Sequence, residues 1–224
     1  MMIGLRRQCG VTFLALGCII GEMGCHLGRI GTADGHASVW MIDESDEHSS
    51  SVIRFHFPPP HDEYAGEVQR VQGMIHLDEE FRLCREGGRF SVDVMDVTLG
   101  EPDLDENVRN NVEFLFGKKF PESTLHLRRI IVDRDRFIRG RYADVTLNGD
   151  FTLKGVSIPL SVTAVLEVVV DPGGFPVLLL GGSFSLENTR ETFGIEGPGA
   201  EDDPSGDRML FEFRFRLVQC SRSP

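Results

Sequence analysis

Apolar and polar residues alternate along most of this chain from about residue 51 onward. A period of two predicts β-strands, because successive side chains of a strand point to opposite faces. The alternation is clearest over residues 145–166, where two apolar faces are separated by a sharp turn; they consist of Val145, Leu147, Phe151 and Leu153, then Leu160, Val162, Ala164 and Leu166. We therefore predict a β-hairpin here, with Pro159 tolerated at the start of its second strand because proline donates no ladder hydrogen bond.

Further alternating segments complete a set of about eight predicted strands. They are residues 51–57, 71–77, 89–94, 124–127, 141–153, 160–170, 182–186 and 209–217. One-sided strands that follow one another suit an antiparallel up-and-down barrel, in which every strand sends alternate residues into a shared interior and closure removes exposed edges. The predicted fold class is all-β, with one short helix between strands.

That helix is predicted over residues 105–119, where the period of two breaks down. Val108, Val112, Leu115 and Phe116 recur at helical spacing, and Asp105 is a candidate N-cap residue. Pro121 ends the pattern, because proline cannot continue a helix. The segment around Phe114–Phe116 is either a lid over one barrel mouth or a plug that packs there permanently.

Three segments resemble the YceI-like family of polyisoprenoid-binding, lipocalin-like bacterial envelope proteins. Residues 149–159 read GDFTLKGVSIP and match the family pattern G-x-[LF]-T-[LI]-x-G-V-[TS]-x-P, while residues 120–127 (FPESTLHL) and 188–195 (NTRETFGI) agree in order and separation. The resemblance covers about residues 39–218 and implies a lipocalin-like barrel domain over residues 39–219. It also implies a bound polyisoprenoid and, as in some relatives, a homodimer. One departure is at residues 105–110 (DENVRN), where many relatives carry basic and imidazole groups near the barrel mouth.

Composition agrees with one β-rich domain and restricts its partners. The 224 residues are 41% hydrophobic, which is enough for a sizeable core in a single domain. The formal net charge is −12 and the pI is near 5.0. Nucleic acid and anionic membrane surfaces are not expected partners, because an acidic protein repels both.

The first 24 residues are interpreted as a signal peptide. Arg6 and Arg7 precede an apolar run over residues 11–20, which is too short for the ~20 residues of a membrane-spanning helix. Cys18 and Cys25 each follow a glycine and are lipidation candidates of a lipoprotein signal; ordinary cleavage is the alternative. Residues 25–38 then form a flexible tether. The protein is expected in the periplasm or cell envelope, with membrane association through the lipid anchor if one is added.

The number of cysteines that remain after cleavage favours Cys25 over Cys18 as the lipidation site. Cleavage at Cys25 leaves only Cys84 and Cys220, an even pair that can form a disulfide in an oxidising compartment.

The inward-facing residues suggest what the barrel does. The predicted lumen-lining, ligand-binding residues are Phe55, Phe57, Phe90, Val92, Val94, Phe114, Phe116, Phe151, Leu153, Phe184, Phe213 and Phe215. An aromatic-lined tube of this kind suits a long apolar chain, such as an isoprenoid lipid or the tail of a quinone. The alternative is an envelope interaction or structural domain whose barrel is filled by these same residues.

No catalytic or cofactor motif stands out. The sequence holds no phosphate-binding loop, nucleophile elbow, Cys-x-x-Cys pair or His-Glu-x-x-His helix. His56 and His61 come close together in sequence, but His56 faces outward and three prolines separate the two, so we predict no preformed metal site there. The sequence therefore predicts a binding protein and not an enzyme.

Overall fold

The computed structural model of the chain describes residues 38–43, 51–68, 70–79, 81–132, 142–197 and 204–220. The predicted signal peptide, almost all of the predicted tether, and the lipidation candidates Cys18 and Cys25 lie outside these ranges. Among the described residues, no helix is long and apolar enough to cross a membrane.

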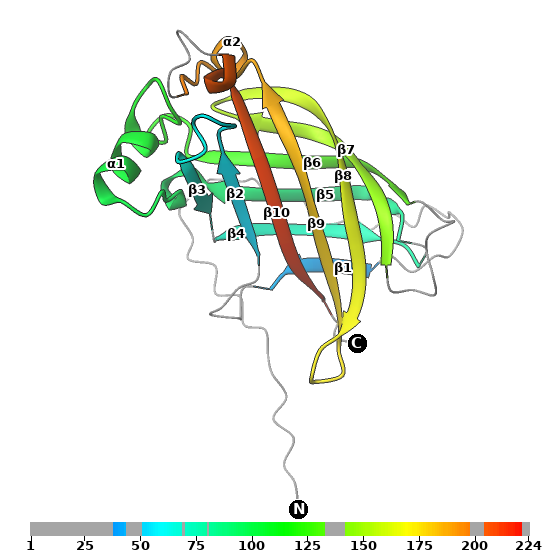
Figure 1. The fold of residues 1–224 in the computed structure, drawn as a ribbon. Helices are drawn as coiled ribbons and strands as arrows, with labels where there is room; N and C mark the ends of the chain where they lie inside the picture. The colour runs from blue at the N-terminus through cyan, green and yellow to red at the C-terminus, as the bar shows by residue number, and fades with distance from the viewer. Residues whose placement is uncertain are drawn as a thin grey trace, which may run out of the picture. The chain divides into compact units, whose positions relative to one another are not determined.

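Eight antiparallel strands close into a barrel, as predicted (Figure 1). In ring order they are β1 (Ser38–Ile42), β4 (Val71–Leu77), β5 (Leu83–Asp93), β6 (Glu122–Val132), β7 (Tyr142–Leu153), β8 (Val156–Val170), β9 (Pro176–Glu187) and β10 (Arg208–Gln219). The ring closes where Ile42 of β1 pairs with Leu217 of β10. The inward alternation of β10 is confirmed, since Met209, Phe211, Phe213, Phe215 and Leu217 are all buried.

An additional hairpin extends the wall at one end of this ring. It consists of β2 (Val52–His56) and β3 (Ala65–Val68), and β2 pairs with residues 210–214 of β10. β3 in turn bridges to the segment after β5 through Glu67 and Thr98. We predicted that residues 51–57 form one strand of the closed ring. That prediction is wrong, because β1 occupies this position and β2 lies outside the ring. The consecutive apolar residues 39–42 in β1 conceal its period of two.

The predicted hairpin at residues 145–166 is confirmed as β7 and β8. Its two-residue turn places Lys154 at φ 51° and Gly155 at φ 77°, the left-handed pair of a type I′ turn. A Cβ on residue 155 would also lie 2.7 Å from the Phe120 ring, so glycine is required there. β8 begins earlier than predicted, and Pro159 lies on the part of it that precedes the β9 pairing, which starts at Ala164. Its missing N–H therefore breaks no ladder bond to β9.

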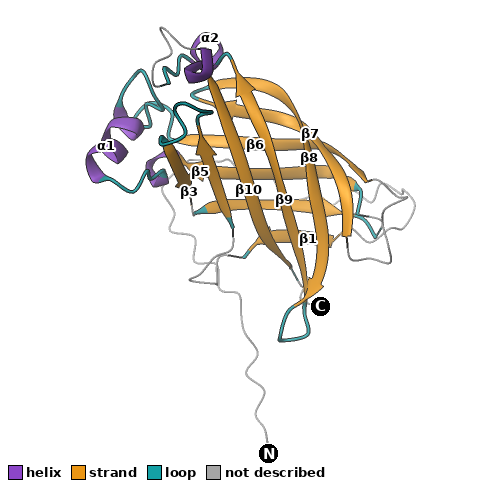
Figure 2. Cartoon of the chain, viewed as in Figure 1, coloured by secondary structure: helices purple, strands orange, loops and turns teal. Residues whose placement is uncertain are grey.

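Two helices lie toward the end of the barrel that carries β2 and β3 (Figure 2). They are α1 (Pro102–Asn110) and α2 (Thr189–Phe193); single turns of 3₁₀-helix form at η1 (Val94–Asp96) and η3 (Pro204–Asp207). The predicted bounds of 105–119 are wrong for α1. The helix begins earlier because Pro102 suits its first turn, and it ends earlier because the Asn111 side chain accepts the N–H of Glu113 in a turn.

The barrel interior divides into a filled half and a hollow half. One buried cluster lies toward β1 and the middle of β7 and β8, and includes Leu147, Leu166 and Leu178, each exposed by 2% or less. A second, rich in phenylalanine, lies toward the two helices. The apolar side chains pack closely in the first half, whereas the second half encloses the cavity described below.

The structure does not bring together Cys84 and Cys220, the possible disulfide pair. Cys84 lies in β5 and is half-buried, whereas Cys220 follows β10 and is exposed. The strand order places β4 and β1 between β5 and β10, so their backbones are about 14 Å apart at ~4.8 Å per strand. A disulfide requires Cα atoms within about 7 Å of each other.

Candidate functional site

The hollow half of the barrel contains an apolar cavity of about 350 Å³. Strands β2–β7, β9 and β10 contribute to its wall, together with α1 and the segments on either side of that helix. Only a few polar side chains line it, namely Tyr64, Ser91, Asn107, Ser123 and Thr124. Its volume falls within the range typical of small-molecule sites.

Eleven of the twelve predicted lumen residues line this cavity. They are Phe55, Phe57, Phe90, Val92, Val94, Phe114, Phe151, Leu153, Phe184, Phe213 and Phe215. Phe116 is the exception: its φ of 50° turns the chain, and its ring packs edge-on against Phe120 at 6.2 Å. The preceding Leu115 points into the cavity wall instead, so the prediction for Phe116 is wrong.

Aromatic rings form a floor between the hollow and filled halves. Phe90 and Phe215 stack at 4.8 Å between ring centroids, and Phe213 lies 5.0 Å from Phe215. Beyond this floor the leucine-rich cluster contains side chains with almost no exposed surface. The cavity is therefore closed at this end.

A second group of aromatic rings forms the side wall. Phe184 and Phe211 stack nearly parallel at 4.9 Å, and Phe151 contacts both. Phe193 of α2 packs edge-on against Phe151, so α2 covers the barrel where β8 and β9 separate before Ala164. Stacked rings present a rigid apolar surface, which keeps the cavity open at little cost in side-chain entropy.

The mouth of the cavity lies between α1 and the loop that joins β2 to β3. Tyr64 in that loop and Leu104 on α1 both line the cavity, yet they are 40% and 38% exposed. Asn107 and Val108 lie one turn further along the same face of α1. Helical spacing therefore directs one stripe of α1 into the mouth.

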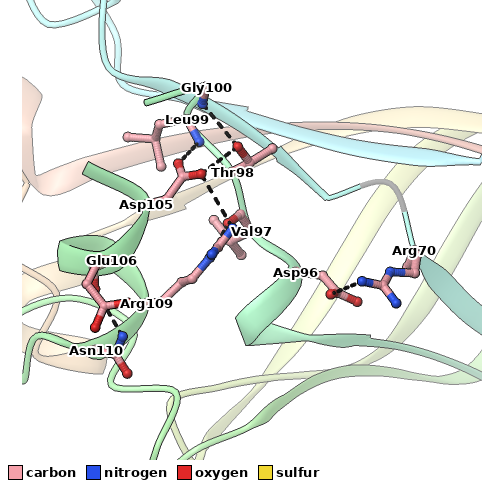
Figure 3. Close-up of polar contacts among 10 residues, drawn as sticks. All are labelled: Arg70, Asp96, Val97, Thr98, Leu99, Gly100, Asp105, Glu106, Arg109 and Asn110. Carbon is pink, nitrogen blue, oxygen red and sulfur yellow. Dashed lines mark hydrogen bonds and ion pairs between the residues drawn. The ribbon is translucent and has the colours of Figure 1, made fainter. Parts of the chain in front are cut away.

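A carboxylate holds α1 in this position (Figure 3). Asp105 accepts hydrogen bonds from the Leu99 backbone N–H at 2.5 Å and from the Thr98 hydroxyl at 2.8 Å. It also pairs with Arg109, whose Nε donates to the Val97 carbonyl at 2.6 Å. The Leu99 N–H holds the pKa of Asp105 below its usual value. The predicted N-cap role of Asp105 is wrong, because its side chain ties the helix back to the segment after β5.

We expect Asp105→Ala to loosen α1 and to cost about 2 kcal/mol of stability, since charged hydrogen bonds contribute ~1.5–3 kcal/mol each. The contribution of Asp105 is complete above the ordinary pKa of about 3.9 and disappears as pH falls through the lowered folded-state pKa. Hydrogen exchange of the α1 amides measures both effects. Asp103→Ala, an exposed neighbour in the same turn, is the control; equal protection in the two variants would contradict this role.

The segment after α1 covers one side of the mouth and is fixed at several points. Within the chain, the Leu115 N–H donates to the Val108 carbonyl at 3.1 Å. The Lys154 ammonium, from the β7–β8 turn, donates to the Val112 carbonyl at 2.6 Å and to the Gly194 carbonyl. Burial lowers the pKa of Lys154. The cover is thus tied to both the β7–β8 turn and the residues after α2.

Several residues of the site are not among the predicted lumen residues. Phe211 lies at the centre of the aromatic side wall, and the alternation along β10 does place it inward. Tyr64 and Leu99 lie in connecting segments and Leu104 lies in a mostly polar helix, outside the strands whose alternation identifies inward residues.

The site offers apolar surface and little reactive chemistry. Within the described parts of the chain, no three His, Cys, Asp or Glu side chains come together as a metal site. His56 lies beside the Phe57 carbonyl, with 3.2 Å between Nδ1 and the oxygen. The Ser123 hydroxyl, near the cavity wall, donates to the Thr152 carbonyl at 2.8 Å.

A protein-family model for the YceI-like domain matches residues 40–217. Solved structures with the same fold include Burkholderia cenocepacia BcnA, at 16% identity and a TM-score of 0.58 over 78% of this chain and 98% of that one. The YceI protein of Campylobacter jejuni is 13% identical, with a TM-score of 0.52 over 70% of this chain and 85% of that one. A polyisoprenoid binding domain from Saccharophagus degradans, implicated in plant cell wall breakdown, is 10% identical, with a TM-score of 0.54 over 84% of this chain and all of that one. A search of curated proteins found no match.

Proposed function

We propose that this chain, which belongs to the YceI-like domain family, holds the apolar chain of an isoprenoid or similar lipid inside its barrel. The observation that carries the proposal is the closed-ended cavity of about 350 Å³ with its phenylalanine lining. A structural relative from Saccharophagus degradans is described as a polyisoprenoid binding domain, which supports the same ligand class. The hollow half argues against the alternative of a barrel filled by its own side chains.

Burial of apolar surface supplies the binding energy. Each CH₂ group moved from water into an apolar site gains about 0.8 kcal/mol. The cavity is already formed in the structure, so little of that gain is lost to rearrangement of the protein. A chain that offers only CH groups also leaves no polar group without a partner inside the cavity.

The size of the cavity limits how much of a chain it holds. A cavity of about 150 Å³ accommodates benzene, with six carbons. By that scale, 350 Å³ holds roughly 14 carbons, or about three isoprene units. A longer polyisoprenoid would insert one end as far as the Phe90–Phe215 floor and leave the rest outside.

A series of prenyl alcohols tests this limit. We expect affinity to rise at least about tenfold from two isoprene units to three, because the third unit still enters the cavity. A fourth unit remains outside and should add less than about threefold. Calorimetric titration of the full chain with alcohols of two, three and four units measures these steps; a constant gain for each unit would contradict a floor at Phe90 and Phe215.

The location of the protein belongs to the same proposal. The leader-like pattern over residues 1–24 supports export, and Cys18 or Cys25 would carry a lipid anchor. Such an anchor would hold the barrel near the bilayer from which an isoprenoid is taken. The mass of the mature protein tests this, because acylation and ordinary cleavage give different masses.

A further inference from the structure

We propose that the mouth of the cavity selects ligands whose head group is uncharged or cationic and rejects those whose head group is anionic. This inference rests on the proposed function, because it concerns the polar end of a molecule whose apolar chain lies in the cavity. The charges around the mouth and the position of the floor support this selectivity.

Acidic side chains dominate the two segments that bound the mouth. Residues 57–64 and 99–108 together contain six carboxylates and no lysine or arginine. They are Asp62, Glu63, Glu101, Asp103, Asp105 and Glu106. All except Asp105 are exposed to solvent. Of the two residues that line the opening, Tyr64 directly follows Glu63 in the sequence, and Leu104 lies between Asp103 and Asp105.

Several cations of the neighbouring segments are engaged by other groups. Arg109 pairs with Asp105 and donates to the Val97 carbonyl. Arg70 pairs with Asp96 at 2.8 Å (Figure 3). The Lys154 ammonium is bound by the Val112 and Gly194 carbonyls, and Lys119 lies over the Phe120 ring at 5.1 Å.

The floor and the charges together determine what the head group meets. A chain of about three isoprene units that reaches the floor places its head group at the mouth. Exposed charges act over about 8 Å at physiological salt, so a phosphate there would be repelled by several carboxylates at once. A hydroxyl or a quinone carbonyl carries no such penalty, and Asn107 and Tyr64 offer it uncharged polar partners.

Three probes with the same chain test the inference on the full-length protein: farnesol, farnesyl phosphate and farnesylamine. We expect farnesyl phosphate to bind at least about tenfold more weakly than farnesol, and the amine to bind as tightly as the alcohol or tighter. Raising the salt to 0.5 M should narrow the gap, since it shortens the screening length. Equal affinity of the phosphate and the alcohol would overturn this inference but leave the proposed function intact. Binding of none of the three would instead overturn the proposed function.

Charge-reversal variants distinguish the effect of the charges at the mouth from the effect of the protein's net charge. Asp62→Lys/Glu63→Lys changes two exposed carboxylates beside Tyr64 and should strengthen farnesyl phosphate binding about tenfold, with little effect on farnesol. Glu79→Lys/Glu167→Lys makes the same change in net charge in the β4–β5 turn and in the far half of β8. This control should leave the preference unchanged. Equal effects of the two double variants would show that net charge, and not the mouth, sets the preference.

Discussion

A Val92→Trp variant is expected to lose at least about 100-fold in affinity for prenyl alcohols while it keeps its fold. Val92 lies in β5, and its side chain lines the cavity beside the aromatic floor. An indole ring there would occupy about a third of the 350 Å³ and displace about one isoprene unit. Losing the burial of five carbons costs about 4 kcal/mol of binding free energy, which corresponds to a loss of more than 100-fold in affinity.

The matched control is Val170→Trp. Val170 ends β8 at the opposite end of the barrel and is 70% exposed, so the same substitution there should leave binding unchanged. Circular dichroism and thermal unfolding establish that both variants are folded. Wild-type affinity in a folded Val92→Trp variant would mean that the ligand does not occupy this cavity.

A Leu166→Ala substitution is expected to have the second large effect, a loss of about 3–5 kcal/mol in the free energy of unfolding. Leu166 is completely buried in the filled half, opposite Ala143 and Leu180. Removing it leaves a new void that its close-packed neighbours cannot fill, which is the costly case for a core leucine. Urea unfolding with a two-state fit measures the loss.

Leu125→Ala provides the comparison in the hollow half. Leu125 lies in β6, is half-buried and already faces the cavity. Its truncation enlarges an existing space and breaks fewer contacts, so we expect a loss below about 2 kcal/mol. Similar losses at Leu166 and Leu125 would contradict the division of this barrel into a filled and a hollow half.

The barrel could be predicted from the sequence because its signal is local. Alternation along β7, β8 and β10 identifies their inward faces directly, and the hairpin turn is marked by Lys154–Gly155. Since a lumen and a core are lined by the same inward faces, the pattern also identified eleven of the residues that line the cavity. It could not say whether those residues enclose space or fill it, which depends on packing between distant strands.

The errors arose where distant contacts override local patterns. Residues 51–57 alternate as a ring strand should, yet β1 takes the ring position because β10 changes partner along its length. Asp105 resembles an N-cap in sequence, but Thr98 and Leu99 recruit its carboxylate from outside the helix. The even number of cysteines left after cleavage at Cys25 suggested a pair, Cys84 and Cys220, but the strand order separates the two.

The mouth of the cavity was the part least accessible to sequence reasoning. Its position follows from how α1 and the β2–β3 loop meet, and α1 carries only two large apolar side chains, Leu104 and Val108. The acidic character of these segments was visible in the sequence. Its bearing on the ligand's head group follows only from the structure, which places both segments beside one opening.

Native mass spectrometry of the full chain with and without farnesol tests the central claim most directly. If the barrel holds an apolar chain, the wild-type protein should gain the mass of one farnesol, and the Val92→Trp variant should gain none at the same concentration. A wild-type protein that keeps its ligand-free mass throughout a titration with farnesol and longer prenyl alcohols would contradict the proposal that this cavity is a lipid-binding site.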